Sequence, residues 1–501
     1  MTDQVIIPQE SIAAIDLGSN SFHMIVARLH EGQLIVVDKL REMVRLAEGI
    51  TEQGSLLPEV EERAIACLER FGQRLRDFEP GSVRAVGTNT LRNASQAGDF
   101  LQRAEQALGH PIDIITGVEE ARLIYLGVSH GIAEDSVRRL VMDIGGGSTE
   151  LIVGEAFKPC HLESLEMGCV AMTKRFFADG EITPKRINRA LIMARNEVAP
   201  HQKAFKKLGW QQAIGASGTI RAVRAVLLEN GWSSEGIPID GLCTLVAKLA
   251  EFSHIDEVSI PGLSAERAPV FLGGVLVLLA TFESLGIKQM VVSDCALREG
   301  LIHDQQGRIR HEDTRTHSVT NLAKRYHVDS EHAEHVINSA QQILKQLKKS
   351  WALHEENHRN WLNWAAQLHE VGLDIAHKHY HHHGAYVIEH TDLAGFSQQE
   401  QRAMSRLVRL HRRKFQPDLI ADLPKRWQQP ITQLSIILRL AFILNRSRSS
   451  NPLSDFTCHA EGKQLKIHFP ENWLDENPLT HADLEQEAIW LAKAGFELSY
   501  Q

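Results

Sequence analysis

The sequence predicts an α/β fold built from two related lobes and followed by a helical region. Three observations support this prediction. Short β-branched segments alternate with helical patterns through the first 300 residues, a loop of the form Asp-apolar-Gly-x-x-Ser occurs twice, and strand signals vanish after about residue 305. A chain of 501 residues is also too long for one ordinary core, so several domains are expected.

Each copy of the repeated loop lies between two predicted strands. Apolar runs at 12–15 and 22–27 flank the first loop, residues 16–21, and similar runs flank the second, residues 143–148. Both loops therefore stand in hairpins and not at strand-to-helix turns, which separates them from Walker and Rossmann loops. One D-x-G turn by itself is usually an ordinary tight hairpin. Two matching ones favour a duplicated domain whose halves face each other across a cleft.

The residues of both loops suit phosphate binding. Glycines let successive backbone N–H groups point toward one anion, and serine hydroxyls add further donors. An aspartate at the loop entrance can hold Mg²⁺ directly or through water, which makes Asp143 a candidate metal ligand. A third glycine turn, after an apolar run, is a further candidate. The candidate phosphate-binding residues of the three turns are Asp16, Gly18, Ser19, Asn20, Ser21, Gly145, Gly146, Gly147, Ser148, Gly215, Ser217, Gly218 and Thr219.

Charged residues beside the predicted strands are candidates for hydrolysis, which needs a carboxylate that orients water. Glu119 and Glu120 follow a strand predicted at 112–115 and begin a helical pattern, where they could equally complement the helix dipole. If side chains alternate between the two faces of the strand that follows the second loop, the Glu150 side chain faces back toward that loop. Arg92 can clamp a phosphate through its guanidinium, although a surface arginine is the commoner interpretation of such a residue.

Beyond about residue 305 the spacing becomes helical. An apolar face follows Ser330, which is the predicted N-cap of its helix. Residues 454–469 predict a hairpin that turns at Glu461-Gly462, and a last helix is expected at about 480–493. The apolar face comprises Ala333, Val336, Ile337, Ala340, Ile343, Leu344 and Leu347. The expected domains are a first lobe at 1–124, a second lobe at 125–304, a helical domain at 305–446 and a small C-terminal domain at 447–501.

Charge and cysteine content narrow the function. A net charge of −9 argues against general affinity for nucleic acid. Residues 401–450 are an exception, because eleven Lys or Arg stand against Asp418 and Asp422, an excess of nine positive charges that suits a polyanion. The six cysteines are scattered without a C-x-x-C pair and are expected to be reduced. We recognise no apolar run of membrane-spanning length and no signal peptide, so a cytoplasmic protein is expected.

Five segments together resemble one protein family. They are AIDLGSNSFHM at 14–24, GVEEARLI at 117–124, DIGGGSTE at 143–150, GASGT at 215–219 and ALREG at 296–300. Their combination is similar to the exopolyphosphatase and guanosine-pentaphosphate phosphohydrolase family, within the actin, sugar-kinase and Hsp70 superfamily, and the resemblance covers essentially the whole chain. It implies an α/β actin-like (ribonuclease H-like) core of two lobes, an all-α HD-like domain and a small α+β C-terminal domain.

The resemblance also implies roles for single residues. Glu120 would be the catalytic base, and Asp143 and Glu150 would hold Mg²⁺ and water. Arg92 would bind the terminal phosphates together with both loops. The implied cofactor is Mg²⁺ or another divalent cation, with stimulation by potassium. The implied assembly is a homodimer, with peripheral association with the inner membrane.

The helical domain departs from the HD pattern that the resemblance brings with it. His369-Glu370 stands where the metal-binding motif needs a His-Asp pair. The tract at 377–383 holds five histidines, but histidines packed so closely more often form a solvated run or a weak adventitious site. We therefore expect this domain to be structural and to guide substrate, without catalysis of its own.

Two substrates would share such a site: inorganic polyphosphate, or pppGpp, which would be converted to ppGpp. Residues 407–414 and Ser293-Asp294 resemble the exopolyphosphatase branch. A polymer of phosphates also needs a distributed basic track, whereas a nucleotide needs one compact pocket. The candidate track residues are Arg409, Arg412, Arg413 and Lys414.

Exopolyphosphatase is accordingly the main expectation, and a pppGpp phosphohydrolase or a dual-activity enzyme is the alternative. A non-catalytic regulator that binds alarmones is disfavoured by the intact Glu120, Asp143 and Glu150. A sugar kinase is disfavoured by residues 119–122 and by the helical domain.

Overall fold

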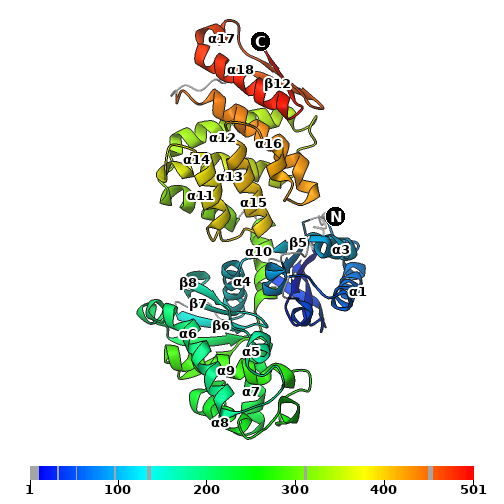
Figure 1. The fold of residues 1–501 in the computed structure, drawn as a ribbon, viewed down its shortest axis with the longest axis vertical. Coiled ribbons are helices and arrows are strands. Elements are labelled where there is room, and N and C mark those ends of the chain that lie inside the picture. The colour runs from blue at the N-terminus through cyan, green and yellow to red at the C-terminus, as the bar shows by residue number, and fades with distance from the viewer. Residues whose placement is uncertain are drawn as a thin grey trace, which may run out of the picture. The chain divides into compact units, whose positions relative to one another are not determined.

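The computed structural model describes residues 11–30, 33–51, 54–79, 81–94, 98–132, 137–309, 313–448 and 455–501. The chain forms two compact units, Met1–Glu312 and Asp313–Gln501 (Figure 1). The first unit contains two α/β lobes, and the second is mainly helical.

The first lobe is organised around a five-stranded sheet of order β3-β2-β1-β4-β5. Strands β1, β2 and β3 form an antiparallel meander, and β4 and β5 continue the sheet in parallel with β1. The central place of β1 explains its continuous apolar run, which is buried on both faces. The strands are β1 (Ser11–Leu17), β2 (Phe22–His30), β3 (Gln33–Glu42), β4 (Val83–Gly87) and β5 (Ile112–Ile114). The helices are η1 (Leu46–Gly49), α1 (Pro58–Leu75), α2 (Asn89–Asn93), α3 (Gly98–Leu108) and α4 (Gly117–His130).

The second lobe repeats this plan in a six-stranded sheet of order β10-β11-β9-β6-β7-β8. Strands β6, β7 and β8 form the meander, β9 and β11 run parallel to β6, and β10 adds an antiparallel edge. The repeat confirms the predicted duplication and the actin-like, ribonuclease H-like fold. The strands are β6 (Arg138–Ile144), β7 (Thr149–Glu155), β8 (Lys158–Leu165), β9 (Gln212–Ala216), β10 (Ile237–Pro238) and β11 (Gln289–Val292). The helices are α5 (Cys169–Phe176), α6 (Pro184–Leu208), α7 (Gly218–Glu229), α8 (Ile239–Leu249), η2 (Ile255–Glu257), α9 (Ala268–Leu285) and α10 (Leu297–Ile309).

Helices α4 and α10 cross at very short range through two glycines. A Cβ atom at Gly127 would lie 2.0 Å from the carbonyl oxygen of Ala296, and one at Gly300 would lie 1.8 Å from that of Leu123. Only glycine fits at either position. Both helices are continuous where we expected domain boundaries: residue 124 lies inside α4 and residue 304 inside α10. Neither position coincides with the end of a helix or strand, so the bounds of the two lobes stay a prediction.

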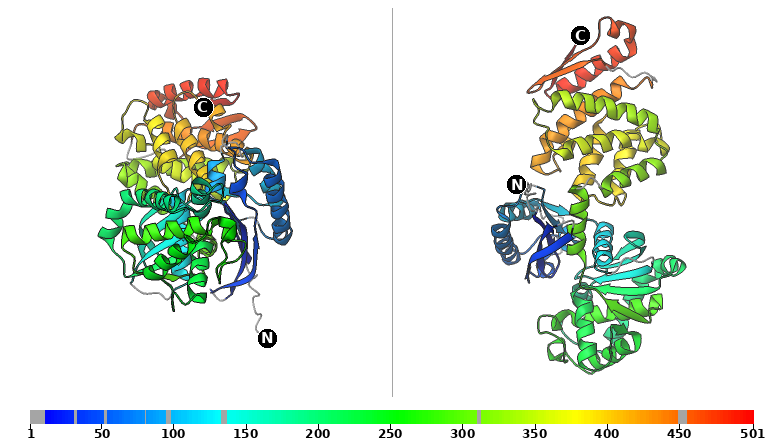
Figure 2. Two further views of the ribbon diagram at one scale, coloured as in Figure 1. Left: turned by 60° about the horizontal axis from the view of Figure 1, so that its bottom comes forward. Right: turned by 180° about the vertical axis from the view of Figure 1, so that it is seen from behind.

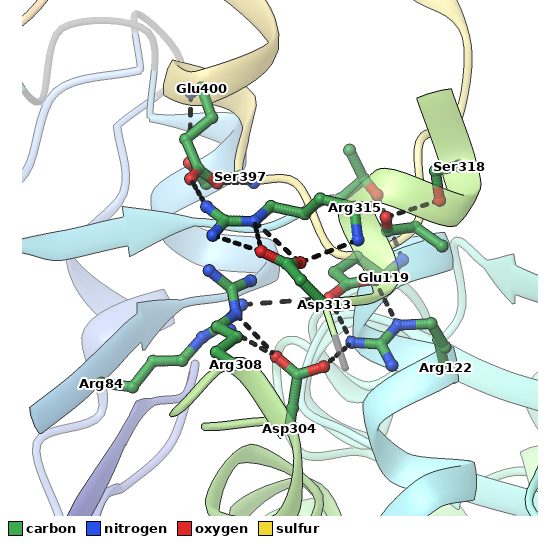
Figure 3. Close-up of polar contacts among 12 residues, drawn as sticks. Arg84, Glu119, Arg122, Asp304, Arg308, Asp313, Arg315, Ser318, Ser397 and Glu400 are labelled. Carbon is green, nitrogen blue, oxygen red and sulfur yellow. Dashed lines mark hydrogen bonds and ion pairs between the residues drawn. The ribbon is translucent and has the colours of Figure 1, made fainter. Parts of the chain in front are cut away.

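A buried ion network joins the same two helices to β4 (Figure 3). Asp304 on α10 accepts hydrogen bonds from Arg84 and Arg122, and Arg122 also donates to both oxygens of Glu119. Arg308 adds a third guanidinium, at 3.1 Å from Asp304. Each of these buried charges would destabilise the fold without its partners, so the network depends on all of its charges being present.

Helix α9 corrects one expectation from the sequence. Its 18 residues are long and apolar enough to cross a membrane by length and composition alone, although we recognised no such run. Most of its side chains are buried in the core of the second lobe, beside those of α5 and α6. A helix that protein encloses over most of its surface is apolar around most of its circumference, which accounts for the composition.

The second unit consists of a helical array and a C-terminal three-stranded sheet (Figure 2). The expected turn at Glu461-Gly462 and the last helix are confirmed, whereas β14 was not anticipated. The N-cap of α12 is Asp329, whose side chain accepts from the amide of His332, and not Ser330. The helices are α11 (Thr314–Arg325), α12 (Ser330–Leu347), α13 (Glu356–Leu368), η3 (Val371–Asp374), α14 (Tyr380–His390), α15 (Gln398–Leu410), η4 (Pro417–Ile420), α16 (Lys425–Leu444), α17 (Trp473–Glu476) and α18 (Pro478–Lys493). The strands are β12 (Thr457–Glu461), β13 (Gln464–His468) and β14 (Glu497–Tyr500).

The C-terminal sheet shares one hydrophobic core with the helices of this unit. Buried side chains of β12, β13 and α18 belong to the same cluster as those of α12, α13 and α16. The boundary expected at 446 thus separates two parts of one compact unit, because the C-terminal sheet buries its apolar face against the helices.

Candidate active site

The two predicted loops meet in one cleft of the first unit. Each follows a central strand, and the hairpins pair Asp16 with His23 and Asp143 with Glu150. A Cβ atom at Gly146 would lie 2.8 Å from the Cβ of Ser19, so the tips of the two loops are in contact range. The duplication thus brings two aspartates and two glycine turns to the same place, as the sequence predicted.

Carbonyl groups of the second loop accept hydrogen bonds that anchor the loop, and two of its amides are left to bind an anion. The amides of Cys169 and Val170 donate to the carbonyls of Gly145 and Gly146, each at 2.9 Å, at the start of α5. Among the described residues, the amides of Gly146 and Gly147 have no acceptor. Adjacent amides with free hydrogens, fixed by a neighbouring helix, form an anion-binding concavity.

Four carboxyl groups are concentrated at this cleft: Asp16, Asp143, Glu120 and Glu150. Burial, opposed by Arg298 and reinforced by Asp143, raises the pKa of Asp16 to about 7. Burial raises the pKa of Asp143 to about 6, against the lowering effect of Arg221 and Arg298. Burial and then the charge of Asp143 raise the pKa of Glu150 to about 7. Burial and then Glu150 raise the pKa of Glu120 well above its usual value.

These carboxyl groups fit a divalent cation. Asp16 Oδ1 and Glu120 Oε2 are buried and have no hydrogen-bond partner among the described residues. Buried carboxylate oxygens without a partner are unfavourable, and oxygen is the ligand that Mg²⁺ and Ca²⁺ prefer. Asp16, Asp143 and Glu120 line the cleft itself, whereas Glu150 lies behind them, where Ser164 Oγ donates to its Oε1 at 2.9 Å.

Three arginines line the cleft together with the carboxyl groups, and no role was predicted for any of them. They are Arg221 on α7, Arg267 before α9 and Arg298 on α10. A Cβ at Gly218 would lie 1.9 Å from Nη2 of Arg267, so this glycine makes room for the guanidinium. Arg298 was part of a family-like segment, but Arg221 and Arg267 belong to no local motif that could have identified them.

His23 is a further residue of the site that the motifs did not single out. Its Nε2 lies 2.8 Å from Ser21 Oγ and its Nδ1 lies 3.2 Å from Nη1 of Arg298. Burial and then Arg298 lower the pKa of His23 to about 3, so the ring is neutral at pH 7. A neutral ring that accepts from Arg298 at Nδ1 carries its hydrogen on Nε2 and donates it to Ser21, which fixes the first loop.

Three predicted phosphate ligands lie outside the lining of the cleft. Arg92 donates to the carbonyl of Ile115 at 2.8 Å and lies 3.5 Å from Glu120, so it acts on that carboxylate. Gly215 is a packing residue, because a Cβ there would meet Ile220 and Met290 at 2.6 Å. Thr219 is also buried away from the cleft, whereas Ser217 and Gly218 of the same turn line it. The turn joins strand β9 to helix α7, and only the two residues at the junction reach the site.

The basic stretch at 401–450 carries less free charge than its composition indicates. Arg406 pairs with Glu389 and Asp422, and Arg439 is fully buried against Glu487. Arg446 and Arg448 also pair with carboxylates. Arg412 stacks on the ring of Tyr380. Of the predicted track residues Arg409, Arg412, Arg413 and Lys414, none has a carboxylate partner within the part of the chain that the structure describes.

Comparison with known proteins gives consistent results over the whole chain. Residues 25–308 match the Ppx/GppA phosphatase family and residues 314–488 match its domain III. A "guanosine-5'-triphosphate,3'-diphosphate pyrophosphatase" of Vibrio cholerae serotype O1 is 38% identical over 494 residues, 98% of each chain. The solved Aquifex aeolicus PPX-GPPA enzyme is 27% identical with a TM-score of 0.51, and covers 59% of this chain and 99% of its own. An exopolyphosphatase of Cytophaga hutchinsonii, 23% identical with a TM-score of 0.54 over 59% of this chain and 98% of its own, shares the fold.

Proposed function

The chain belongs to the Ppx/GppA phosphatase family, whose members hydrolyse phosphoanhydride bonds, and from this premise we propose that it converts pppGpp to ppGpp. Water would attack the terminal phosphorus of the 5′-triphosphate, the anhydride bond would break, and orthophosphate would leave. The observation that carries this proposal is the meeting of both loops, the carboxyl groups and three arginines in one compact cleft. The name of the full-length relative from Vibrio cholerae supports the same substrate.

Glu120 is the residue best suited to accept a proton from the attacking water. Its Oε2 is buried at the edge of the cleft without a hydrogen-bond partner, and its pKa is raised by burial and by Glu150. A carboxylate with a raised pKa is a stronger base, provided that it is deprotonated at the working pH. Arg92, 3.5 Å away, favours the deprotonated form and orients the group.

The rest of the cleft binds and orients the substrate. The amides of Gly146 and Gly147 and the hydroxyls of Ser19 and Ser148 are donors for the terminal phosphate oxygens. The three cleft arginines pair with the remaining phosphate charge. A divalent cation held by Asp16 and Asp143, for which we propose Mg²⁺, would offset phosphate charge when bound.

Proton release should accompany Mg²⁺ binding. Since the pKa of Asp16 is raised to about 7 and that of Asp143 to about 6, these two groups lose protons as the pH rises from 6 to 8. A cation must displace those protons, so its apparent Kd should rise as pH falls, by about tenfold per unit for each proton released. Calorimetric titration of Mg²⁺ at pH 6, 7 and 8, in two buffers of different ionisation enthalpy, measures both quantities. An equal Kd at all three pH values contradicts the expectation.

The substrate is identified by comparing the rates at which the enzyme hydrolyses three candidate substrates. With Mg²⁺ present, orthophosphate release from pppGpp, from long-chain polyphosphate and from ATP is compared as kcat/KM. We expect pppGpp to have the highest value. Arg267→Gln should lower kcat/KM for pppGpp by about tenfold or more, since a charged hydrogen bond contributes about 1.5–3 kcal/mol. A chain that releases phosphate from polyphosphate only would refute this substrate.

Polyphosphate is the second candidate, favoured by the unpaired charges of the track residues. We expect Arg413→Glu with Lys414→Glu, both exposed residues, to raise KM for long polyphosphate while pppGpp turnover stays unchanged. Arg412 is spared because its stacking on Tyr380 could affect folding. The matched control is Arg402→Glu with Lys425→Glu, which changes the charge of the same unit equally. Identical effects of the two pairs would exclude a local track.

A homodimer, a cytoplasmic location and peripheral association with the inner membrane stay predictions.

A further inference from the structure

A second group of possible ligands lies in the helical unit. His332 is on α12, and His369 and Glu370 follow α13. One potential ligand atom from each lies within 4.8 Å of the other two. All three side chains are buried: His332 is 3% exposed, His369 0% and Glu370 5%.

The two histidines have ring nitrogens that make no hydrogen bond to any described residue. His369 Nδ1 donates to the carbonyl of Ala366 at 2.7 Å, which leaves Nε2 with its lone pair. Nε2 of His369 and both ring nitrogens of His332 have no hydrogen-bond partner among the described residues. Neutral imidazoles held by a backbone carbonyl are in the form that binds a metal, whereas buried nitrogens without any partner are destabilising.

A positive charge already lies at the carboxylate of this group. Nη2 of Arg448 donates to Oε1 of Glu370, the oxygen nearest to both histidines, and Nη1 donates to Asp329 at 2.9 Å. The guanidinium side chain is 45% exposed, so it can leave without unpacking the core. A guanidinium offers only donors and satisfies the carboxylate, but no hydrogen bond from it to either imidazole is present in the described residues.

We propose that His332, His369 and Glu370 bind one divalent transition-metal ion. When the ion binds, it takes the place of the Arg448 guanidinium at the carboxylate of Glu370. Two imidazole nitrogens and one carboxylate oxygen form a ligand set of the zinc type, with a position left open for water, and they differ from the all-oxygen sets that Mg²⁺ and Ca²⁺ prefer. The sequence predicted that the HD metal motif is not intact here, because glutamate replaces aspartate after His369. The geometry shows that the longer side chain still reaches the histidines. The site is independent of the cleft in the first unit.

The experiment uses the full-length chain and Co²⁺ as the probe, with its visible absorption as the readout. Exposed His377, His379 and His382 are first replaced by glutamine, because the tract could bind metal by itself. Titration and dialysis are carried out in excess Mg²⁺, which occupies the carboxyl groups of the cleft, and we then expect one equivalent of bound cobalt by mass spectrometry. His332→Gln and His369→Gln should each weaken binding by about 10–100-fold or more. His358→Gln, another histidine that is buried (4% exposed) and has an unpartnered nitrogen, is the matched control and should bind as the background does.

Arg448→Met supplies a test that does not depend on the folding of histidine variants. Removing the competing guanidinium frees Glu370 and should tighten Co²⁺ binding by about tenfold, which corresponds to about 1.4 kcal/mol. Unchanged affinity in Arg448→Met would overturn the exchange with Arg448. Cobalt uptake that is absent in the background, or equal in His332→Gln, His369→Gln and His358→Gln, would overturn the site itself.

Discussion

Glu120→Gln is expected to lower kcat for pppGpp by about 10²–10⁴-fold, the usual contribution of a general base. The amide has the same shape but cannot accept a proton from water. It also removes a negative charge from a cleft that binds a polyanion, so substrate affinity should be retained or increased. Orthophosphate release under saturating Mg²⁺ gives kcat, and calorimetry with the inactive variant gives the Kd of pppGpp.

The matched control is Glu166→Gln, an exposed glutamate of the same unit. It makes the same chemical change away from the cleft and should leave kcat unaltered. If Glu120→Gln and Glu166→Gln hydrolyse pppGpp at similar rates, Glu120 is not the base. A loss of substrate binding together with turnover would assign Glu120 to binding.

The pH profile separates Glu120 from its neighbour Glu150. The base must be deprotonated, so kcat should fall as pH decreases through the raised pKa of Glu120. Glu150 raises that pKa by like-charge repulsion, after burial. Glu150→Gln should therefore move the acidic limb of the profile to lower pH. An acidic limb that stays in place would show that Glu150 does not contribute to the raised pKa of Glu120.

The sequence was sufficient for features that are encoded locally. A hairpin with an aspartate before its turn is specified by consecutive residues, so both loops and the duplication were predicted. The turn at 215–219 shows the limit of such patterns. Gly215 is required because it packs against Ile220 and Met290, not because it binds a ligand. A glycine needed for packing and a glycine needed for phosphate binding look the same in a sequence.

Features that depend on contacts between distant segments could not be predicted. Arg221 and Arg267 reach the cleft from separate helices, and no spacing links them to the loops. The basic stretch was overestimated for the same reason. A count of charges does not reveal that Arg439 is buried against Glu487, 48 positions away. This pairing removes part of the basis on which polyphosphate was preferred, and the compact group of cleft arginines instead favours a nucleotide.

Asp304→Asn is expected to destabilise the first unit by about 3–5 kcal/mol, the cost of breaking a buried ion pair by removing one partner. Asp304 is 4% exposed and accepts from Arg84 and from Arg122, the latter at 2.6 Å. Asparagine keeps the volume but leaves buried guanidinium charge with Glu119 as its remaining carboxylate. Urea unfolding followed by fluorescence measures the free energy of unfolding. The matched control is Asp179→Asn, which breaks an exposed pair with Arg186 and should have little effect.

The pH dependence of that stability follows from the same charges. Burial alone would raise the pKa of Asp304, but Arg122, Arg84 and Arg308 together hold it well below its usual range. A carboxyl group whose pKa is lowered on folding stabilises the protein above its unfolded pKa of about 4, and that stabilisation is lost as pH falls. The difference in unfolding free energy between wild type and Asp304→Asn should therefore be constant from pH 8 to 5 and diminish below about pH 4. A difference that is equally large at pH 3 would mean that asparagine destabilises the unit through packing, and that the network joining α4, α10 and β4 does not depend on this charge.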